Sequence, residues 1–359
     1  MWIYLLLASG LFMGWSLGTN DAANAFGTAV ATRVIKYRTA VIIIALAVII
    51  GAVVQGEGNI GKLSELAESN DVIASVEDID DPDDEDERKT LRLKSTLKAA
   101  IIFACAALTV FVMSYLKFPV SANQSITGAI IGWGLFHADY GNPEVLATNL
   151  PQIGKFAITW LINPLGAAVI SFVIVFFVKK FLENRIMSMK NYDTFIKVGY
   201  LVAGTVAAYS IGVNSSASVT ALYYDATGLG INLLSNATLT AVIGGVAIAV
   251  GVLTFSRRVM MTVGGSIADI NQVEGFLVVI AMALTILIME KAMGIPVSTS
   301  QAVVGAVIGA GLVTSIKTKS LSNVNFKVFG RIGIAWVSSP TVAGLLTYLV
   351  ALTTKGYFA

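Results

Sequence analysis

Charged residues are scarce in this sequence. Only 13% of its 359 residues are Asp, Glu, Lys or Arg, whereas 56% are hydrophobic. A soluble domain of this length does not combine so little charge with so much apolar surface, so the composition indicates a protein that crosses a membrane several times. The net charge is only +2, and no basic patch is interleaved with aromatic residues, so we expect no nucleic-acid partner.

Cysteine and histidine each occur once, as Cys105 and His137. A single cysteine excludes an internal disulfide. A single histidine excludes most zinc sites and every mechanism that pairs serine with histidine. Asp21 has no obvious carboxylate partner inside an apolar segment, as an aspartyl protease in a membrane would need. We therefore expect a protein that is not an enzyme and that uses no organic cofactor.

Apolar segments long enough to cross a bilayer recur along the chain. They lie at about 1–31, 39–55, 97–116, 118–136, 155–178, 196–213, 236–255, 275–293, 295–313 and 331–352. The expected fold class is an all-α polytopic membrane protein. The segments that begin at 118 and 295 are rich in glycine, serine and threonine, so each could be a short span or a re-entrant hairpin.

The first apolar segment contains a polar motif, Gly-Thr-Asn-Asp-Ala-Ala-Asn-Ala-Phe-Gly, at residues 18–27. Side-chain oxygens in hydrocarbon are costly unless they face a cavity or a ligand. Small residues and glycine also allow a helix to unwind and present carbonyl groups to an ion. The motif therefore predicts a broken helix that holds a cation. The alternative is a polar contact between two helices, which rarely needs a carboxylate such as Asp21.

An internal repeat organises the rest of the chain. Residues 119–134 read Pro-Val-Ser-Ala-Asn-Gln-Ser-Ile-Thr-Gly-Ala-Ile-Ile-Gly-Trp-Gly, and residues 296–311 read Pro-Val-Ser-Thr-Ser-Gln-Ala-Val-Val-Gly-Ala-Val-Ile-Gly-Ala-Gly. Trp160 and Pro164 recur as Trp336 and Pro340. The pattern Ser-x-Gly-x-Asn at 16–20 recurs at 210–214. Shared residues in register over such lengths indicate a duplication.

Loop charges predict that the two halves are inverted relative to each other. Corresponding loops carry opposite charge bias: the turn at 33–38 is basic where its counterpart at 222–234 is not, and the loop at 314–331 is basic where 137–154 is acidic. We expect a first inverted repeat at 1–178, a cytoplasmic linker at 179–195 and a second inverted repeat at 196–359. Residues 57–95 should form a polar acidic insertion, and its acidic run at 80–87 should be a solvated loop outside the membrane. Both termini should lie outside the cell.

The motif at 18–27, followed by two Pro-Val-Ser-x-x-Gln segments, resembles the inorganic phosphate transporter (PiT) family, whose members carry a Gly-Ala-Asn-Asp-Val-Ala-Asn-Ala type motif in each half. The resemblance covers nearly the whole chain outside the acidic insertion. It implies two inverted repeats with broken helices and helical hairpins, and an assembly that is commonly a homodimer. It also implies import of inorganic phosphate with sodium by alternating access.

The residues themselves fit an anion site at the starts of two half-helices. Proline needs no N–H partner, serine can cap a helix, and the N–H groups and dipole of a helix N-terminus bind oxyanions. Neither motif contains Arg or Lys, so cations should balance the anion's charge. The candidate anion-binding residues are Ser121, Gln124, Ser125, Ser298, Thr299, Ser300 and Gln301.

Energetics favour coupling to a cation. Moving one negative charge inward against 100 mV costs about 2.3 kcal/mol, so concentrative uptake needs a co-transported ion. Sodium prefers oxygen ligands, as other hard cations do. The candidate sodium ligands are Asn20, Asp21 and Asn24 of the first half and Asn214, Ser215 and Ser218 of the second.

The chain departs from the family pattern at several positions. Ser215 and Ser218 stand where the family motif has Asp and Asn, and Met261 stands where members often carry glutamate. Gln124 and Gln301 occupy a place that is often histidine. These departures leave the number of coupled cations open, together with the anion and the driving ion. Two alternatives follow: a sulfate permease of the same family, or a passive anion channel.

Overall fold

The computed structural model describes residues 2–70, 72, 85–140, 144–183, 188–222, 236–263, 270–293, 297–319 and 325–358. These residues form helices, and no strand is found among them. The helices are α1 (Trp2–Ala31), α2 (Tyr37–Gln55), α3 (Glu57–Ser69), α4 (Glu85–Tyr115), α5 (Ala122–Tyr140), α6 (Glu144–Glu183), α7 (Met189–Ser215), α8 (Ala217–Thr220), α9 (Ala237–Phe255), α10 (Arg257–Val263), α11 (Gln272–Met293), α12 (Thr299–Thr318), α13 (Phe326–Thr353) and α14 (Lys355–Phe358).

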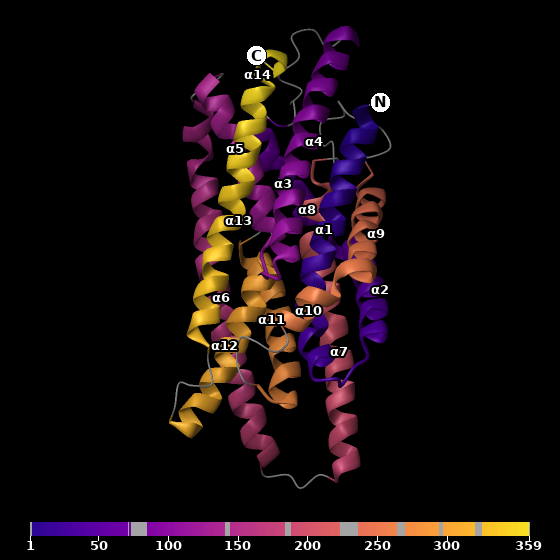
Figure 1. Cartoon of the computed structure of the whole chain (residues 1–359), viewed down its shortest axis with the longest axis vertical. Coiled ribbons are helices and arrows are strands. Elements are labelled where there is room, and N and C mark those ends of the chain that lie inside the picture. The colour runs from indigo at the N-terminus through magenta and orange to yellow at the C-terminus, as the bar shows by residue number, and fades with distance from the viewer. Residues whose placement is uncertain are drawn as a thin grey trace.

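Most of the long helices run along one axis of an elongated bundle (Figure 1). Eight stretches within the described helices are long and apolar enough to span a membrane. They correspond to eight of the ten expected segments, and the two others, 1–31 and 118–136, form α1 and α5. The protein is therefore an all-helical, multi-pass membrane protein.

Helix α1 is continuous, so the prediction that it breaks at the 18–27 motif is wrong. It runs as one α-helix of 30 residues through the motif. A Cβ atom at Gly18 would lie 2.0 Å from the Ile248 carbonyl oxygen of α9. The glycine therefore allows two helices to approach closely, and it does not unwind the backbone. In the second half, only a bend at Ser216 separates α7 from α8.

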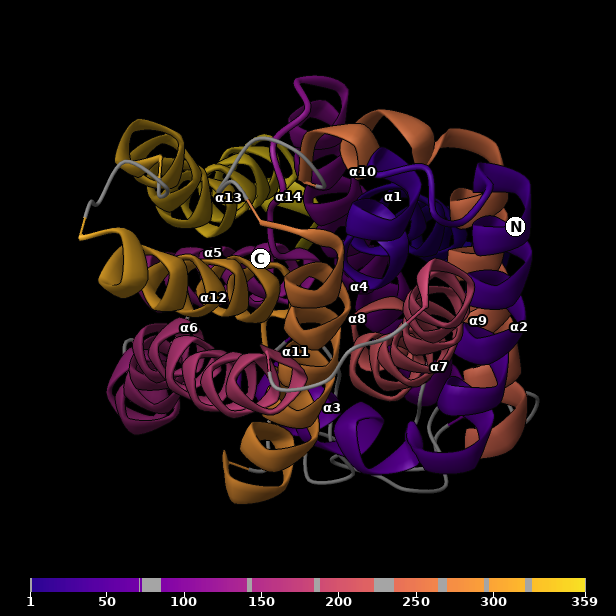
Figure 2. The same ribbon diagram turned by 90° about the horizontal axis from the view of Figure 1, so that it is seen from below.

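The two halves of the chain are interlocked. Helix α9 packs on α1 at Gly18, and α2 packs on α7 at the equivalent Gly212, where an added Cβ would meet the Val48 carbonyl oxygen at 2.2 Å. In the same way α6 packs on α12 at Gly305, and α13 packs on α5 at Gly128. Each contact has a counterpart at the spacing of the repeat. Seen along the axis, α5, α6, α12 and α13 group on one side and α1, α2, α7 and α9 on the other (Figure 2).

The direction of the helices agrees with inverted repeats. In Figure 1, α1 and α6 descend, whereas their counterparts α7 and α13 ascend. Both termini lie at the upper end, which we call the terminal end. The junction from α6 to α7 lies at the opposite end, which we call the α6–α7 end. The division at 179–195 and the placement of the termini outside the cell stay predictions.

Two helical hairpins enter the bundle from opposite ends. Helices α4 and α5 form a hairpin that opens toward the terminal end, and α11 and α12 form one that opens toward the α6–α7 end (Figure 1). Their tips meet, because Asn123 of α5 donates to the Val297 carbonyl and Ser300 of α12 donates to the Val120 carbonyl. The glycine-rich helices α5 and α12 are therefore the second arms of two helical hairpins, and whether each hairpin is re-entrant stays a prediction.

The expected polar insertion at 57–95 is helical at both of its described ends. Its first part is α3, which buries Ile60, Leu63 and Leu66 in the core. Its last part is the beginning of α4. The first part of the insertion therefore packs on the core through an apolar stripe at helical spacing. Most of the acidic run at 80–87 lies outside the described residues, and Glu85 and Asp86 within it are exposed.

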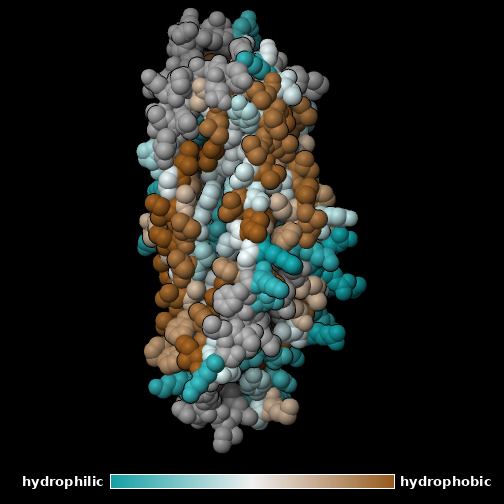
Figure 3. All heavy atoms as spheres, turned by 60° about the vertical axis from the view of Figure 1, so that its left-hand side comes forward, coloured by the Kyte–Doolittle hydropathy of each residue, from teal (hydrophilic) through white to brown (hydrophobic). Residues whose placement is uncertain are grey.

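The outer surface carries long apolar stripes. Along α6, Leu161, Leu165 and Val169 are 70%, 68% and 64% exposed, at the spacing of one helix face. Helix α13 exposes Val337 and Leu345 in a similar way. Figure 3 shows such apolar stretches running along the molecule. Large exposed apolar surfaces of this kind are expected where lipid replaces water.

The contact between α6 and α12 depends on a glycine. A Cβ atom at Gly305 would lie 2.1 Å from the Pro164 carbonyl oxygen, which cannot move without its helix. We expect Gly305→Ala to destabilise the protein by about 1–3 kcal/mol through overpacking, measured as a lower Tm in detergent. The matched control is Gly333→Ala in α13, where an added Cβ meets nothing within 4 Å. An equal loss of stability in both variants would contradict this role of Gly305.

Candidate functional site

Two asparagines fix the hairpin tips to the core helices. Asn214 of α7 donates from Nδ2 to the Val297 carbonyl and accepts from the Val297 N–H, both at 2.8 Å. Its counterpart Asn20 of α1 accepts from the Val120 N–H at 3.2 Å and donates to the Phe118 carbonyl and to Ser114 Oγ. Each amide therefore satisfies backbone groups in a segment that has no helical partners of its own.

The tips are also bonded to each other. Asn123 Nδ2 donates to the Val297 carbonyl at 2.8 Å, and Ser300 Oγ donates to the Val120 carbonyl at 2.7 Å. Asn123 and Ser300 occupy equivalent positions of the repeat, and so do Val120 and Val297. The two half-helices that follow the tips, α5 and α12, therefore begin side by side in the interior of the molecule.

Asp21 lies beside these tips and is only 2% exposed. Ser215 Oγ donates to Asp21 Oδ2 at 3.3 Å, and Asn24 Nδ2 lies 3.5 Å from Asp21 Oδ1. Asn24 also donates to Thr299 Oγ1 at 3.2 Å and to Ser300 Oγ at 3.4 Å. Because Asp21 and Asn24 are three residues apart, an unbroken helix presents both to the α12 N-terminus.

The carboxylate is incompletely neutralised by these neighbours. Asp21 is the sole ionisable side chain among the described residues that form this hydrogen-bonded cluster. Asn24 Oδ1 is buried and accepts no hydrogen bond. A buried carboxylate is costly unless a cation or several donors compensate its charge. A carboxylate and an unsatisfied amide oxygen on one helix face suit a hard cation such as sodium.

The second half offers no equivalent carboxylate. Ser215 stands at the position of Asp21 and donates to Asp21 itself. Ser218 stands at the position of Asn24 and donates to Asn123 Oδ1. The repeat therefore places polar residues at equivalent positions of the two halves, but only the first half carries a negative charge there.

The N-termini of α5 and α12 are capped by the predicted serines. Ser121 Oγ accepts from the Gln124 N–H, and Ser298 Oγ accepts from the Gln301 N–H, both at 3.2 Å. Neither cap uses the N–H groups of the first two residues of each helix, and N–H groups at this position of a helix are the ones that bind anions. These residues are Ala122 and Asn123 in α5, and Thr299 and Ser300 in α12.

Three more predicted residues lie in the first turns of the same helices. Ser125 Oγ donates to the Ser121 carbonyl at 3.1 Å, so its hydroxyl is already engaged within α5. Gln124 and Gln301 are buried, and the Oε1 atom of each accepts no hydrogen bond. The structure therefore brings the predicted anion-binding and sodium-binding residues into one buried region at the two tips.

Two residues of this region were absent from the sequence-based list. Asn123 bridges the tips, and it could have been found because it lies inside the Pro-Val-Ser motif at the position of Ser300. Asn163 of α6 donates to the Ser298 carbonyl at 2.7 Å, and its Oδ1 is buried without a partner. Its only sequence signal is an amide inside an apolar span, next to Pro164.

Comparison with known proteins gives a family match over most of the chain. Residues 17–347 match the model of a family described as the phosphate transporter family. A protein of Pyrococcus horikoshii named as a candidate phosphate permease is 25% identical, over 97% of each chain. One of Methanocaldococcus jannaschii with the same description is 26% identical, over 97% of this chain and 96% of its own.

Two further similarities bear on fold and on substrate. The sulfate permease CysP of Bacillus subtilis is 27% identical, over 95% of this chain and 84% of its own. A solved structure described as the sodium-dependent phosphate transporter superposes with a TM-score of 0.74, at 22% identity and with 99% of both chains covered. The architecture above is therefore shared with a known transporter.

Proposed function

Because the chain belongs to the phosphate transporter family, we propose that it imports inorganic phosphate together with sodium by alternating access. The observation that carries this proposal is the meeting of two capped helix N-termini beside one buried carboxylate. The N–H groups and dipoles of α5 and α12 bind the anion. Asp21 and its neighbours hold sodium.

The anion-binding residues of this proposal are those at the two tips. The donors for the anion are the first-turn N–H groups of the two helices, among them those of Thr299 and Ser300, because the Ser300 hydroxyl already donates to the Val120 carbonyl. Gln124 and Gln301 can turn their amide groups toward the ligand. Ser121 and Ser298 act through their caps, and Ser125 supports the first turn of α5.

The sodium-binding residues centre on Asp21. Asn24 Oδ1 and Ser215 Oγ are the partners that its surroundings favour. Asn20, Asn214 and Ser218 already bond the tips, and each oxygen keeps a lone pair with which it can also contact an ion. A phosphate dianion beside Asp21 brings the negative charge to three, so two sodium ions restore the charge of the empty site.

Sulfate is the second candidate substrate, because the relatives include a protein named as a sulfate permease beside those named as phosphate permeases. Sulfate and phosphate are both tetrahedral oxyanions, and a relative named as a sulfate permease covers nearly the whole chain. A passive channel is the third candidate. It needs the two helix N-termini but not Asp21.

Uptake of labelled phosphate into proteoliposomes separates these functions. We expect concentrative uptake that requires an inward sodium gradient and that a large excess of sulfate does not inhibit. Strong competition by sulfate, together with faster uptake of labelled sulfate than of phosphate, would make sulfate the substrate. Equal rates with and without the gradient would reject a symporter. Assembly as a homodimer and location in the cell membrane stay predictions, and crosslinking of the purified protein in bilayers tests the first.

A further inference from the structure

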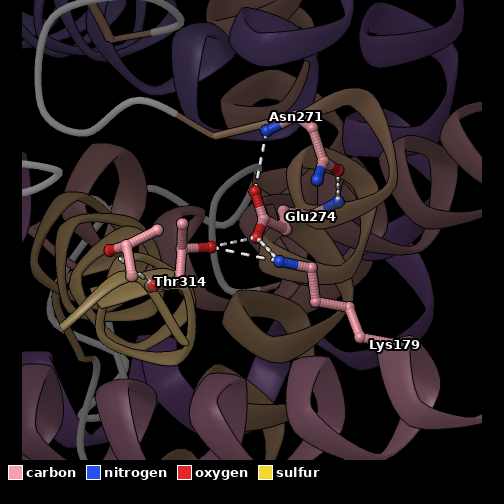
Figure 4. A network of polar contacts seen from close by, with 5 residues as sticks. Lys179, Asn271, Glu274 and Thr314 are labelled. Carbon is pink, nitrogen blue, oxygen red and sulfur yellow. Dashed lines mark hydrogen bonds and ion pairs between the residues drawn. The ribbon is translucent and has the colours of Figure 1, made fainter. Parts of the chain in front are cut away.

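A second polar network lies near the end of α6 that leads to α7, and Figure 4 shows it from close by. Lys179 Nζ of α6 donates to Glu274 Oε1 of α11, and Thr314 Oγ1 of α12 donates to the same oxygen at 2.7 Å. Lys179 also donates to Thr314 Oγ1 at 3.1 Å. One carboxylate oxygen thus joins three helices that are separate in the sequence.

Both charges of this pair are removed from water. The side chain of Glu274 is 2% exposed and that of Lys179 is 17% exposed. Charges buried in this way depend on each other, because loss of one leaves the other without compensation. Breaking this pair is therefore costly, whereas an exposed ion pair on the surface is screened by water and contributes little.

Glu274 has a separate role at the start of α11. Its Oε2 accepts from the Asn271 N–H at 2.7 Å, while Asn271 Oδ1 accepts from the Glu274 N–H at 3.0 Å. This reciprocal pair caps the helix, and glutamine can replace glutamate in it. The cap and the ion pair can therefore be removed independently.

Helix α6 is bonded to the α11–α12 hairpin both at the tip and at the base of the hairpin. Asn163 bonds the tip at Ser298, and Lys179 bonds the base at Glu274 and Thr314. Between them, Gly305 packs against the Pro164 carbonyl. Thr299 and Thr314 lie about four turns apart on α12, roughly 22 Å along its axis. A movement of the hairpin base relative to α6 is thus carried to the proposed binding site by a rigid helix.

The first half of the chain has no carboxylate at the position equivalent to Glu274. At the spacing of the repeat, the counterparts of Lys179, Thr314 and Glu274 are Lys355, His137 and Leu97. Leucine cannot accept a hydrogen bond or pair with a cation, so the carboxylate at the centre of the network has no counterpart there. At this position of the repeat, the buried carboxylate is therefore present in the second half only.

We propose that Lys179 and Glu274 are positioning residues that hold the α11–α12 hairpin against α6 and keep the α6–α7 end closed. The inference rests on the proposed alternating access, in which each hairpin must open in turn. Breaking the pair shifts the population toward a state that is open at the α6–α7 end, because the opposite hairpin has no equivalent carboxylate to release.

A cysteine reporter measures this shift without transport. Cys105 is the only cysteine, so Cys105→Ala gives a background without thiols. Ala310 is buried and lies one turn before Thr314 on the same face of α12, between α6 and α11. Ala310→Cys is labelled with a membrane-impermeant thiol reagent added from either side of proteoliposomes. Glu274→Gln, which keeps the helix cap, should raise labelling from the α6–α7 side about tenfold, within the usual range of conformational coupling.

The matched control is Asn271→Ala, which removes the half of the cap made by Asn271 Oδ1 and keeps the ion pair. We expect it to leave the sidedness of labelling unchanged. Equal labelling in Glu274→Gln and its parent, an equal rise from both sides, or the same rise in Asn271→Ala would each overturn the proposal.

A second variant covers the case in which Glu274→Gln alone does not fold. The pair Lys179→Met and Glu274→Gln removes both charges, and it should give the same one-sided rise. If neither variant folds while Asn271→Ala does, the ion pair is required for folding and the positioning role is rejected. Labelling needs neither phosphate nor sodium. A one-sided rise in Glu274→Gln, together with no phosphate uptake by the parent protein, would therefore reject the proposed substrate and retain the positioning role.

Discussion

Replacing Asp21 with asparagine should abolish sodium-dependent uptake and leave the protein folded. Two unit charges 4 Å apart at an effective dielectric constant of about 20 attract by about 4 kcal/mol. Removing the carboxylate should thus weaken sodium binding by up to about three orders of magnitude. Asparagine has nearly the same shape, and its Oδ1 can still accept from Ser215 Oγ.

Thermal unfolding provides a readout that does not depend on transport. A ligand that binds only the folded state raises Tm with its concentration. We expect sodium to raise the Tm of the parent protein but not that of Asp21→Asn. Without sodium the variant should be at least as stable as the parent, because a buried and poorly compensated charge has been removed. Sodium-driven uptake that survives in a folded Asp21→Asn variant would refute the role of this residue.

Replacing Asn214 with alanine should destabilise the hairpin tip and lower uptake. Asn214 Oδ1 accepts the Val297 N–H at 2.8 Å, and this donor is buried. An unsatisfied buried donor costs about 1–3 kcal/mol, which a lower Tm in detergent would measure. The Val297 carbonyl keeps its bond from Asn123, so the N–H group accounts for most of the loss.

The control for this variant is Asn191→Ala, which changes an exposed asparagine near the start of the same helix. It should leave both Tm and uptake unchanged. The sodium dependence of uptake adds a second test. A higher half-saturating sodium concentration in Asn214→Ala would support the predicted sodium ligand, whereas an unchanged one would limit Asn214 to bracing the tip. An Asn214→Ala protein as stable as the parent would contradict the bracing role.

The sequence was most informative where residues close together in the chain determine the local structure. The Pro-Val-Ser segments begin helices as predicted, because a capping serine and the N–H three residues later are close in any such turn. The polar motif at 18–27 was located correctly, but its backbone was not. Gly18 reads equally well as a point of unwinding and as a point of close helix contact, and only the position of α9 distinguishes the two.

Composition and the internal repeat were enough to establish a multi-pass helical membrane protein and to indicate which residues are equivalent in its two halves. Only the tertiary structure showed that the hairpin tips meet, that Asn123 and Asn163 bond them, and that Lys179 pairs with Glu274. These contacts join residues 95 to 174 positions apart. Periodicity and local patterns report on the face and the end of a helix, whereas the partner on that face is determined by how all the helices pack together.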